Sequence, residues 1–260
     1  MGVYNCSVTL PLAIDSILNQ TYSNVELVIC DDCSTDDTYQ VAQRYQEQYP
    51  NRIFLIRNER NLTLGPTLNH CLRYATGEYI ARMDGDDASA PDRLFKQWQF
   101  LKEHPQYDLV GTCMMAFNDE GELGLRAIKT GEATRLDTVF EVPFCHATIL
   151  ARRSVYDDLQ GYSCRKHSWR VEDVDLWFRF FQAGKRGYNL GEALYYVRED
   201  GSEYRRRTFR NHFNAMYTCL RGAWALHLPI RYKLGAFLPV LKYFVPLWAV
   251  KLYHKKKNRE

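Results

Sequence analysis

The sequence lacks the features that define several protein classes. Its 34 basic and 31 acidic residues leave a net charge of +3, which is too small to indicate a nucleic-acid-binding protein. It shows no secretory signal ahead of its eight cysteines, which are scattered and lie mostly in apolar contexts. We therefore expect buried free thiols in a reducing cytoplasm rather than a disulfide framework.

Some of the cysteines have spacings that redox or metal sites use. Cys30 and Cys33 have the spacing of a redox pair, and Cys145, Cys164 and His167 can be combined into a zinc site. The first pair, however, ends a strand and enters an Asp-rich turn, and no second Cys pair completes a zinc ribbon. We favour buried thiols over both kinds of site.

The sequence also lacks a long uncharged hydrophobic run. Residues 234–253 are nearly long enough to span a bilayer, but they contain Lys242, Lys251 and two prolines. We expect an interfacial helix pair there, whose apolar face enters a membrane shallowly while the lysines meet anionic lipid. The alternative is a helix packed on the domain itself. The basic residues that end the chain are Lys251, Lys255, Lys256, Lys257 and Arg259.

What is present is a globular composition with alternating elements. Hydrophobic residues make up 46% of the 260 residues, enough for one large α/β domain with a helical appendage. Strands that alternate with helices predict right-handed crossovers and a mainly parallel central sheet flanked by helices, with a C-terminal helical tail. The expected strands are 25–30, 53–56, 79–83, 110–117 and 147–151, and the expected helices are 12–19, 35–49, 67–74, 91–103 and 172–184.

The beginning of the chain is short for this pattern. Residues 1–5 form only a stub where a buried first strand of about five or six residues is expected. Either this strand is very short or the natural start lies upstream, and we expect the second.

Three carboxylates occupy four positions after the expected strand at 79–83. Asp84, Asp86 and Asp87 repel one another unless a partner neutralises them. A hard divalent cation with oxygen ligands, Mn²⁺ or Mg²⁺, is such a partner, and it commonly carries the phosphates of a substrate. Open α/β sheets bind ligands at the carboxyl ends of their strands, where this turn is expected. The alternative is a solvated acidic turn.

Two further acidic pairs have functional positions. Asp31 and Asp32 follow the expected strand at 25–30, where a carboxylate can accept hydrogen bonds from a nucleobase or ribose. Glu172 and Asp173 begin a helix, whose N-terminus favours the ionised form that a general base needs. Asp173 alternatively caps that helix.

With these motifs the chain resembles the inverting family 2 glycosyltransferases with the GT-A fold, of the bacterial polysaccharide and cell-surface glycan type. The resemblance covers most of residues 1–200 and implies a nucleotide-diphosphate-sugar donor, most often a UDP-sugar. It rests on residues 2–5, 16–22, Asp31-Asp32-Cys33-Ser34-Thr35-Asp36, 58–65 with Asn69, 77–80, 84–87, 91–93 and Glu172-Asp173.

The resemblance also implies roles for single residues. Tyr4, Asp32 and Asp84 would contact the nucleotide, and Asp86 would bind the metal with help from Asp84. Asp173 would deprotonate the acceptor hydroxyl as the catalytic base. Residues 1–112 would then be the nucleotide-sugar-binding half and 113–210 the acceptor-binding half of one domain, followed by the tail at 211–260.

Four more residues are candidates near the diphosphate or acceptor. His146 looks like the family's site histidine, and a buried, hydrogen-bonded histidine is the alternative. Glu172 adjoins the expected base. Arg205 and Arg206 belong to a basic run that would close over the diphosphate, with a solvated basic loop as the alternative.

The chain departs from the family pattern in informative places. Cys33 stands where the family usually has glycine, at a turn position that often needs positive φ, which predicts some backbone strain. The Q-x-x-R-W motif of processive synthases is absent, and residues 204–207 stand roughly in its place. We therefore expect an enzyme that adds a single sugar.

Three functions follow as hypotheses. The leading one is metal-dependent inverting transfer of a sugar to a glycan or lipid-linked acceptor at the inner face of the cell membrane, by a cytoplasmic, peripheral protein. The second is transfer to polyprenyl phosphate, and the third is a glycosyltransferase-like protein that acts as a non-catalytic binding partner. Four basic residues can face an anionic acceptor or simply the solvent: Arg126, Lys129, Arg165 and Lys166.

Overall fold

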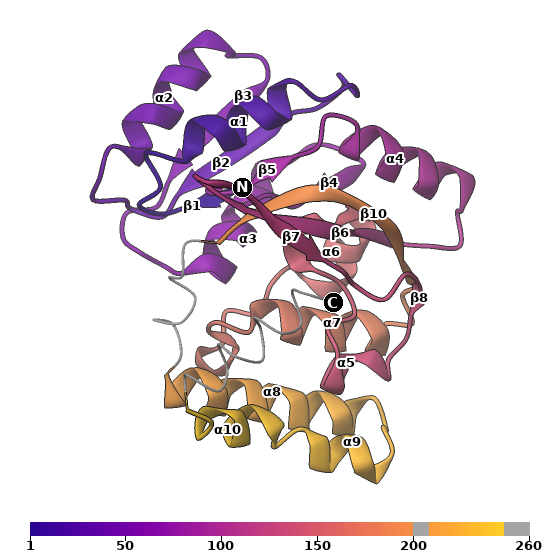
Figure 1. Cartoon of the computed structure of the whole chain (residues 1–260). Coiled ribbons are helices and arrows are strands. Elements are labelled where there is room, and N and C mark those ends of the chain that lie inside the picture. The colour runs from indigo at the N-terminus through magenta and orange to yellow at the C-terminus, as the bar shows by residue number, and fades with distance from the viewer. Residues whose placement is uncertain (200–207, 247–260) are drawn as a thin grey trace.

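The computed structural model describes residues 1–199 and 208–246. Figure 1 shows two sheets with helices on their faces, and beneath them the helices of the C-terminal tail. The predicted α/β class and the helical tail are confirmed.

The first sheet contains β1 (Gly2–Val3), β2 (Leu27–Asp31) and β3 (Ile53–Arg57), in that order and all parallel. Every residue of β2 is buried, as its continuous hydrophobic sequence predicts for a central parallel strand. The helices α1 (Leu10–Leu18), α2 (Thr38–Gln48) and α3 (Leu64–Tyr74) follow the three strands in turn. This half has the regular alternation that the sequence predicts.

β1 has two residues, and the amino group of Met1 donates a hydrogen bond to the Val28 carbonyl oxygen, 2.7 Å away. A cavity of about 420 Å³ lies beside it, lined by Met1, Val28, Ile80 and Met83 among others. An upstream natural start stays a prediction.

The second sheet is mixed, which corrects the prediction of mainly parallel pairing for this half. Its order is β4-β9-β6-β10-β5, with β7 beside β6 and β8 beside β10. Only the β6–β10 pairing is parallel among its described ladders. Two residues join β6 to β7, and so short a connection permits only a hairpin. The strands are β4 (Tyr79–Ala81), β5 (Ala88–Ser89), β6 (Leu109–Asn118), β7 (Gly121–Arg126), β8 (Gly131–Ala133), β9 (Leu150–Arg152) and β10 (Gly187–Arg198).

The helices of this half pack an aromatic core against the sheet. They are α4 (Arg93–Glu103), α5 (Asp137–Phe140), α6 (Arg153–Leu159) and α7 (Glu172–Gln182), with 3₁₀ turns at His146–Thr148 (η1) and Lys166–Ser168 (η2). Trp177 and Phe180 of α7 are buried with Phe144 in edge-to-face contacts. The strand expected at 147–151 is shorter and later, because η1 occupies its first residues.

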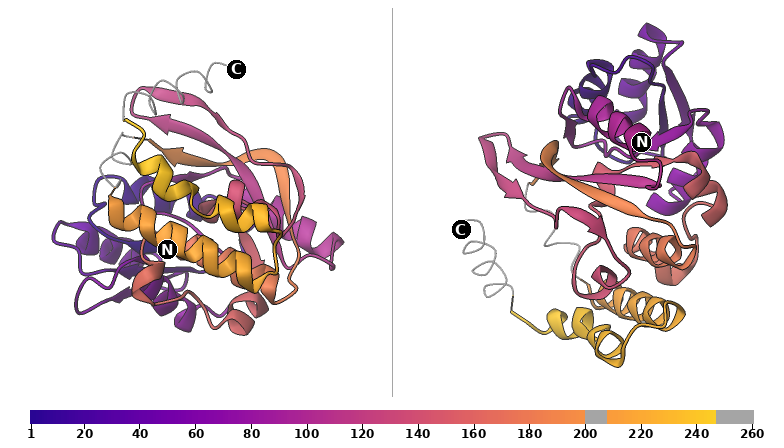
Figure 2. Two further views of the ribbon diagram at one scale, coloured as in Figure 1. Left: turned by 90° about the horizontal axis from the view of Figure 1, so that it is seen from below. Right: turned by 90° about the vertical axis from the view of Figure 1, so that its right-hand side faces the viewer.

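The tail forms α8 (Phe209–Ala225), α9 (Ile230–Gly235) and α10 (Leu238–Tyr243), as Figure 1 and Figure 2 show. α8 packs on α7 through Phe178, Cys219 and Ala223. A Cβ at Gly222 would lie 2.1 Å from the Phe178 ring, so this helix contact needs glycine. The inner face of α8 thus follows the prediction of a helix packed on the domain.

The outer face of the tail remains apolar and exposed. Its exposed side chains include Phe213, Trp224, Ile230, Leu234, Leu241 and Phe244. Within the described residues, no helix combines the length and apolar character needed to cross a membrane.

Candidate active site

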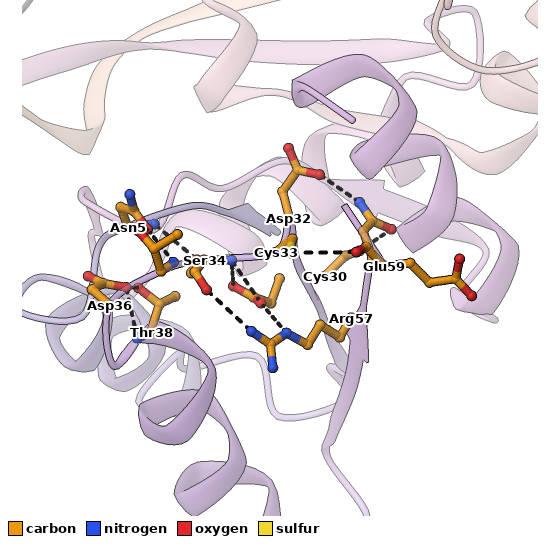
Figure 3. A network of polar contacts seen from close by, with 12 residues as sticks. Asn5, Cys30, Asp32, Cys33, Ser34, Asp36, Thr38, Arg57 and Glu59 are labelled. Carbon is orange, nitrogen blue, oxygen red and sulfur yellow. Dashed lines mark hydrogen bonds and ion pairs between the residues drawn. The ribbon is translucent and has the colours of Figure 1, made fainter. Parts of the chain in front are cut away.

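The turn after β2 is held by hydrogen bonds from several segments (Figure 3). The Asp31 carboxylate is fully buried, accepts a hydrogen bond from the Ser34 backbone N–H and forms an ion pair with Arg57 at 3.1 Å. The Asn5 side chain accepts a hydrogen bond from the Thr35 backbone N–H at 2.9 Å. The turn is therefore fixed to β3 and to the end of β1.

Asp32 joins this turn to the loop before α3. Its carboxylate accepts hydrogen bonds from the Asn58 side chain at 2.8 Å and from the backbone N–H groups of Leu62 and Thr63 at 2.8 and 2.9 Å. Asp32 is only 4% exposed, whereas the neighbouring Tyr4 is 48% exposed. The nucleotide contact of Asp32 stays a prediction, and its anchoring of the loop is a role that the sequence did not reveal.

Two details of this turn test the sequence interpretation. Cys33 has φ +60°, so the prediction of positive φ is confirmed. The sequence Ser34-Thr35 also predicts a helix cap there, and this prediction is wrong, because the N-cap residue of α2 is Asp37 and makes no side-chain cap hydrogen bond. Burial alone would raise the pKa of Asp36, but hydrogen bonds from Thr38 and Ser7 lower it to about 2.

The acidic turn after β4 brings together Asp84, Asp86 and Asp87. One carboxylate oxygen of each lies within 4.8 Å of the others, and no further group of three or more His, Cys, Asp or Glu ligands occurs within residues 1–199 and 208–246. Burial, followed by the charges of Asp84 and Asp86, raises the pKa of Asp87 to about 7. Crowded carboxylate oxygens fit a hard divalent cation.

Asp87 differs from its two neighbours. It is 3% exposed, and its carboxylate accepts hydrogen bonds from the Tyr195 hydroxyl at 2.8 Å and the Arg198 backbone N–H at 2.7 Å. These contacts tie the turn to β10. Asp84 and Asp86 are half-buried and remain the better candidates for a metal, as the sequence predicted.

Arg82 is a residue of this site that the sequence analysis missed. Its side chain is 6% exposed, and its guanidinium forms an ion pair with Asp84. Its charge adds to burial in lowering the pKa of His146, and it opposes the larger effect of burial, which raises the pKa of Asp173. A cation at the end of a strand, two residues before the acidic cluster, was the available signal.

Asp173 lies in the first turn of α7, with Val171 as the N-cap residue. The capping alternative is therefore wrong for Asp173. Its carboxylate accepts a hydrogen bond from the Val174 backbone N–H at 2.8 Å, and burial raises its pKa above the usual 3.8. A half-buried carboxylate with a raised pKa suits a general base.

His146 lies in η1 between Tyr162 and Trp177. Its Nε2 is 2.8 Å from the Tyr162 hydroxyl, and both aromatic rings contact it edge-on. Burial, and then the charge of Arg82, lowers the pKa of His146 well below 6.5. The imidazole is therefore neutral near pH 7 and hydrogen-bonded, and its role at the diphosphate or acceptor stays a prediction.

The remaining candidates are a buried glutamate and two arginines that the structure does not describe. Glu172 is 7% exposed and packs against α3, where a Cβ at Gly65 would lie 3.2 Å from its Cγ. Burial raises the pKa of Glu172. Arg205 and Arg206 lie outside the described residues.

Residues 3–9 connect the two acidic turns. The Cys6 backbone N–H donates to the Thr38 hydroxyl at 2.8 Å, and the Thr9 hydroxyl donates to the Gly85 carbonyl oxygen at 3.0 Å. A Cβ at Gly85 would lie 2.8 Å from Val3 Cγ1, so only glycine permits this approach. Tyr4 therefore sits between the Asp32 turn and the metal-binding candidates.

Residues 1–160 match the family described as "Glycosyl transferase family 2". The chain is 45% identical over 257 residues to the "Putative glycosyltransferase EpsE" of Bacillus subtilis (strain 168), covering 99% of this chain and 92% of that protein. It is 31% identical over 200 residues to the "O-antigen biosynthesis glycosyltransferase WbnJ" of Escherichia coli, covering 75% and 76%.

A solved structure supports the same fold. The crystal structure of S. aureus TarS 1-349 in complex with UDP superposes with a TM-score of 0.70 at 20% identity, covering 92% of this chain and 69% of that one. The predicted GT-A fold is thereby confirmed. The chain belongs to glycosyl transferase family 2 and is a glycosyltransferase.

Proposed function

We propose that this protein transfers a sugar from a nucleotide-diphosphate donor, a UDP-sugar, to a hydroxyl of a glycan or lipid-linked acceptor, with inversion, in the synthesis of a surface polysaccharide. One observation carries the proposal. Arg82 pairs with Asp84, the candidate metal ligand, and its charge also acts on Asp173, the candidate base. The donor and acceptor would meet at this point.

Tyr4, Asp32 and Asp84 would receive the nucleotide. Tyr4 offers an exposed ring beside the fixed turn that ends in Asp32. The relative TarS was solved with UDP, which supports the choice of UDP as the nucleotide.

Asp84 and Asp86 would hold Mn²⁺ or Mg²⁺. A bound ion supplies positive charge to the departing diphosphate. The protein would position this ion, since Tyr195 and the Arg198 backbone hold Asp87 and so orient the whole acidic turn. The basic run with Arg205 and Arg206 would add charge at the diphosphate.

Asp173 would take the proton from the attacking acceptor hydroxyl. Its place in the first turn of α7 and the charge of Arg82 both favour the carboxylate form, which opposes the effect of burial. Glu172 and the neutral His146 would border the acceptor. Attack from the face opposite the leaving diphosphate would invert the anomeric carbon.

The tail would keep the enzyme at the inner face of the cell membrane. No Asp or Glu occurs between Glu203 and Glu260, and α8, α9 and α10 expose large apolar side chains. A basic, apolar surface suits an anionic membrane. Deleting residues 225–260 should shift the protein from the membrane to the soluble fraction, and an unchanged partition would count against membrane binding.

A transfer assay tests the proposed reaction. Purified protein is incubated with radiolabelled UDP-sugars and either lipid-linked saccharides or polyprenyl phosphate, with Mn²⁺ or with EDTA. We expect Mn²⁺-dependent transfer to a saccharide hydroxyl, with inversion seen by NMR of the product. Transfer to polyprenyl phosphate alone would favour the second hypothesis.

The Asp173→Asn variant assigns the base. Loss of a general base typically costs about 10²–10⁴-fold in rate. Asp119→Asn, which alters a carboxylate that is 92% exposed, is the matched control. Retained transfer in Asp173→Asn, or retention of configuration, would overturn this mechanism.

A further inference from the structure

The loop before α7 carries exposed cations that form no ion pair with any carboxylate in residues 1–199 and 208–246. Of the four basic residues that the sequence offered, Arg126 pairs with Glu199 and Lys129 pairs with Asp137. Arg165 and Lys166 are exposed, and within the described chain neither forms an ion pair with a carboxylate. The structure thus separates two residues with internal partners from two that face outward.

Helix α8 adds two arginines to this loop. Arg210 stacks over the Trp169 ring at 5.1 Å, and Arg221 donates to His167 Nε2 at 2.7 Å. The two arginines are 11 positions apart, which corresponds to about 16 Å along a helix. They contact the loop at Trp169 and at His167, and with Arg165, Lys166 and Arg170 they form what we name the cation collar.

The collar has a fixed shape. The Asn214 side chain donates to the Trp169 carbonyl oxygen at 3.2 Å, and the Tyr217 ring contacts His167. Arg170 has φ +65°, a conformation that non-glycine residues adopt at an energetic cost. A strained, exposed arginine held by a packed helix is expected where a ligand uses it.

Among the residues that the structure describes, no carboxylate forms an ion pair with a cation of the collar, although the charges of Asp175 and Glu172 act on His167 and Arg170. Burial, and then the charges of Arg221 and Arg165, lowers the pKa of His167, so the cations already repel a further positive charge. Arginine binds phosphate oxygens through paired N–H donors. A ligand with several phosphate oxygens would neutralise the collar.

The collar adjoins the expected base. Arg170 precedes Asp173 by three residues, and its charge acts on Glu172. α8, which contacts the loop of the collar, also carries the exposed apolar side chains of Phe213 and Trp224. A ligand bound at the collar thus has the base on one side and the apolar tail surface on the other.

We propose that the cation collar binds the diphosphate group of a lipid-linked acceptor, whose sugar hydroxyl then faces Asp173. This inference rests on the proposed function, because it names the acceptor class for the same site. The apolar chain of the lipid would leave along the tail surface.

Vesicle binding tests the proposal without catalysis. The full chain is titrated with phosphatidylcholine vesicles that contain geranylgeranyl diphosphate, in EDTA so that the acidic cluster recruits no metal. Phosphatidylglycerol replaces the diphosphate at equal charge in a second series. The variant is Arg165→Gln/Lys166→Gln/Arg170→Asn, with Asn at 170 because it tolerates positive φ.

We expect the variant to bind the diphosphate vesicles about tenfold more weakly or worse, since charge-assisted phosphate contacts are lost. Its binding to phosphatidylglycerol vesicles should stay within about twofold of wild type, because the tail surface is unchanged. The matched control, Arg44→Gln/Arg73→Gln/Lys102→Gln, removes three exposed cations from α2, α3 and α4 and should bind as wild type.

Two results would overturn the collar: unchanged affinity for the diphosphate vesicles, or an equal loss on both surfaces, which would mean a general attraction to anionic lipid. UDP binding with Mn²⁺ is measured on the same protein preparations in buffer without EDTA. If wild type bound no nucleotide while the collar result held, the proposed function would fail and the diphosphate site would stand.

Discussion

The two acidic turns contain the same residue type in opposite surroundings. After β2, Asp31 and Asp32 are buried, and their carboxylates accept hydrogen bonds from the chain or pair with Arg57. After β4, Asp84 and Asp86 crowd against Asp87, whose pKa rises to about 7 because of burial and their charges. The carboxylates of the first turn are held by hydrogen bonds and an ion pair within the protein, whereas those of the second are crowded in a way that fits a cation.

The two turns therefore suit different roles: the first fixes the shape of the site, and the second favours a bound cation. A carboxylate whose hydrogen bonds are made by the chain stabilises the fold and forms a fixed wall for a ligand. Carboxylates that repel one another favour the binding of a positive charge, because it relieves their repulsion. Arg82 supplies part of this positive charge through its ion pair with Asp84.

The largest effect should distinguish the turns by stability. Asp32→Ala should lower the free energy of unfolding by about 3 kcal/mol, because it leaves two backbone N–H groups and Asn58 without their acceptor. Asp86→Asn should change it by less than about 1 kcal/mol, since it also relieves repulsion. Urea unfolding at pH 7 measures both, and an equal loss in the two variants would erase the distinction.

The pH dependence should set Asp173 apart from the carboxylates of the first turn. Because burial raises its pKa above 3.8, Asp173 becomes protonated at a higher pH than an exposed aspartate. The value of kcat/KM should then fall about tenfold per pH unit below that pKa. Asp36, with a pKa of about 2, stays ionised over this range. A rate that is flat to pH 4 in folded protein would contradict the assignment.

Removing the charge of Arg82 should raise the metal affinity of the second acidic turn and so increase its difference from the first. If Arg82 competes with the metal for Asp84, Arg82→Gln should bind Mn²⁺ without nucleotide about fivefold more tightly, as loss of a nearby like charge predicts. Arg82→Lys keeps the charge and should stay near wild type, and Arg44→Gln controls for net charge. Electron paramagnetic resonance of free Mn²⁺ gives the affinities, with circular dichroism to verify folding. Unchanged or weaker binding in Arg82→Gln would disprove the competition.

The smallest effect concerns the strained turn. Cys33→Gly should raise the free energy of unfolding by about 0.5 kcal/mol, since relief of the left-handed conformation slightly exceeds the entropy cost of glycine. Thermal unfolding measures it, with Cys164→Gly as a control at an exposed cysteine without positive φ. A destabilised Cys33→Gly would show that the thiol's contact with the Glu59 carbonyl oxygen outweighs the strain.

These contrasts show what a sequence reveals and what it does not. Hydrophobic runs and helix periodicity were enough to predict β2, β3 and α7, because local pattern dictates them. The mixed pairing of β6 and β10 depends on partners that are distant in sequence, so alternation alone suggested more parallel pairing than exists. The positive φ at Cys33 was predictable because the turn motif demands it.

The candidate site divides in the same way. Motif spacing identified Asp84, Asp86 and Asp173, whose roles rest on residue type and position. Arg165 and Lys166 of the collar were named from the sequence as candidates to face an anionic acceptor, but Arg82 and the collar's other arginines were missed. Their significance lies in contacts made in three dimensions. The collar joins residues 45 and 54 positions apart, Asn214 with Trp169 and Arg221 with His167. No periodicity encodes such a contact.

The most direct test of the division of labour is calorimetric titration of UDP, with Mn²⁺ and with EDTA, into wild type, Asp86→Ala and Asp173→Asn. GDP and dTDP serve as comparisons. We expect Mn²⁺-dependent UDP binding that Asp86→Ala abolishes and that Asp173→Asn keeps within about twofold, because a base contacts the acceptor and not the nucleotide. Undiminished binding in Asp86→Ala, or its loss in Asp173→Asn, would contradict the account.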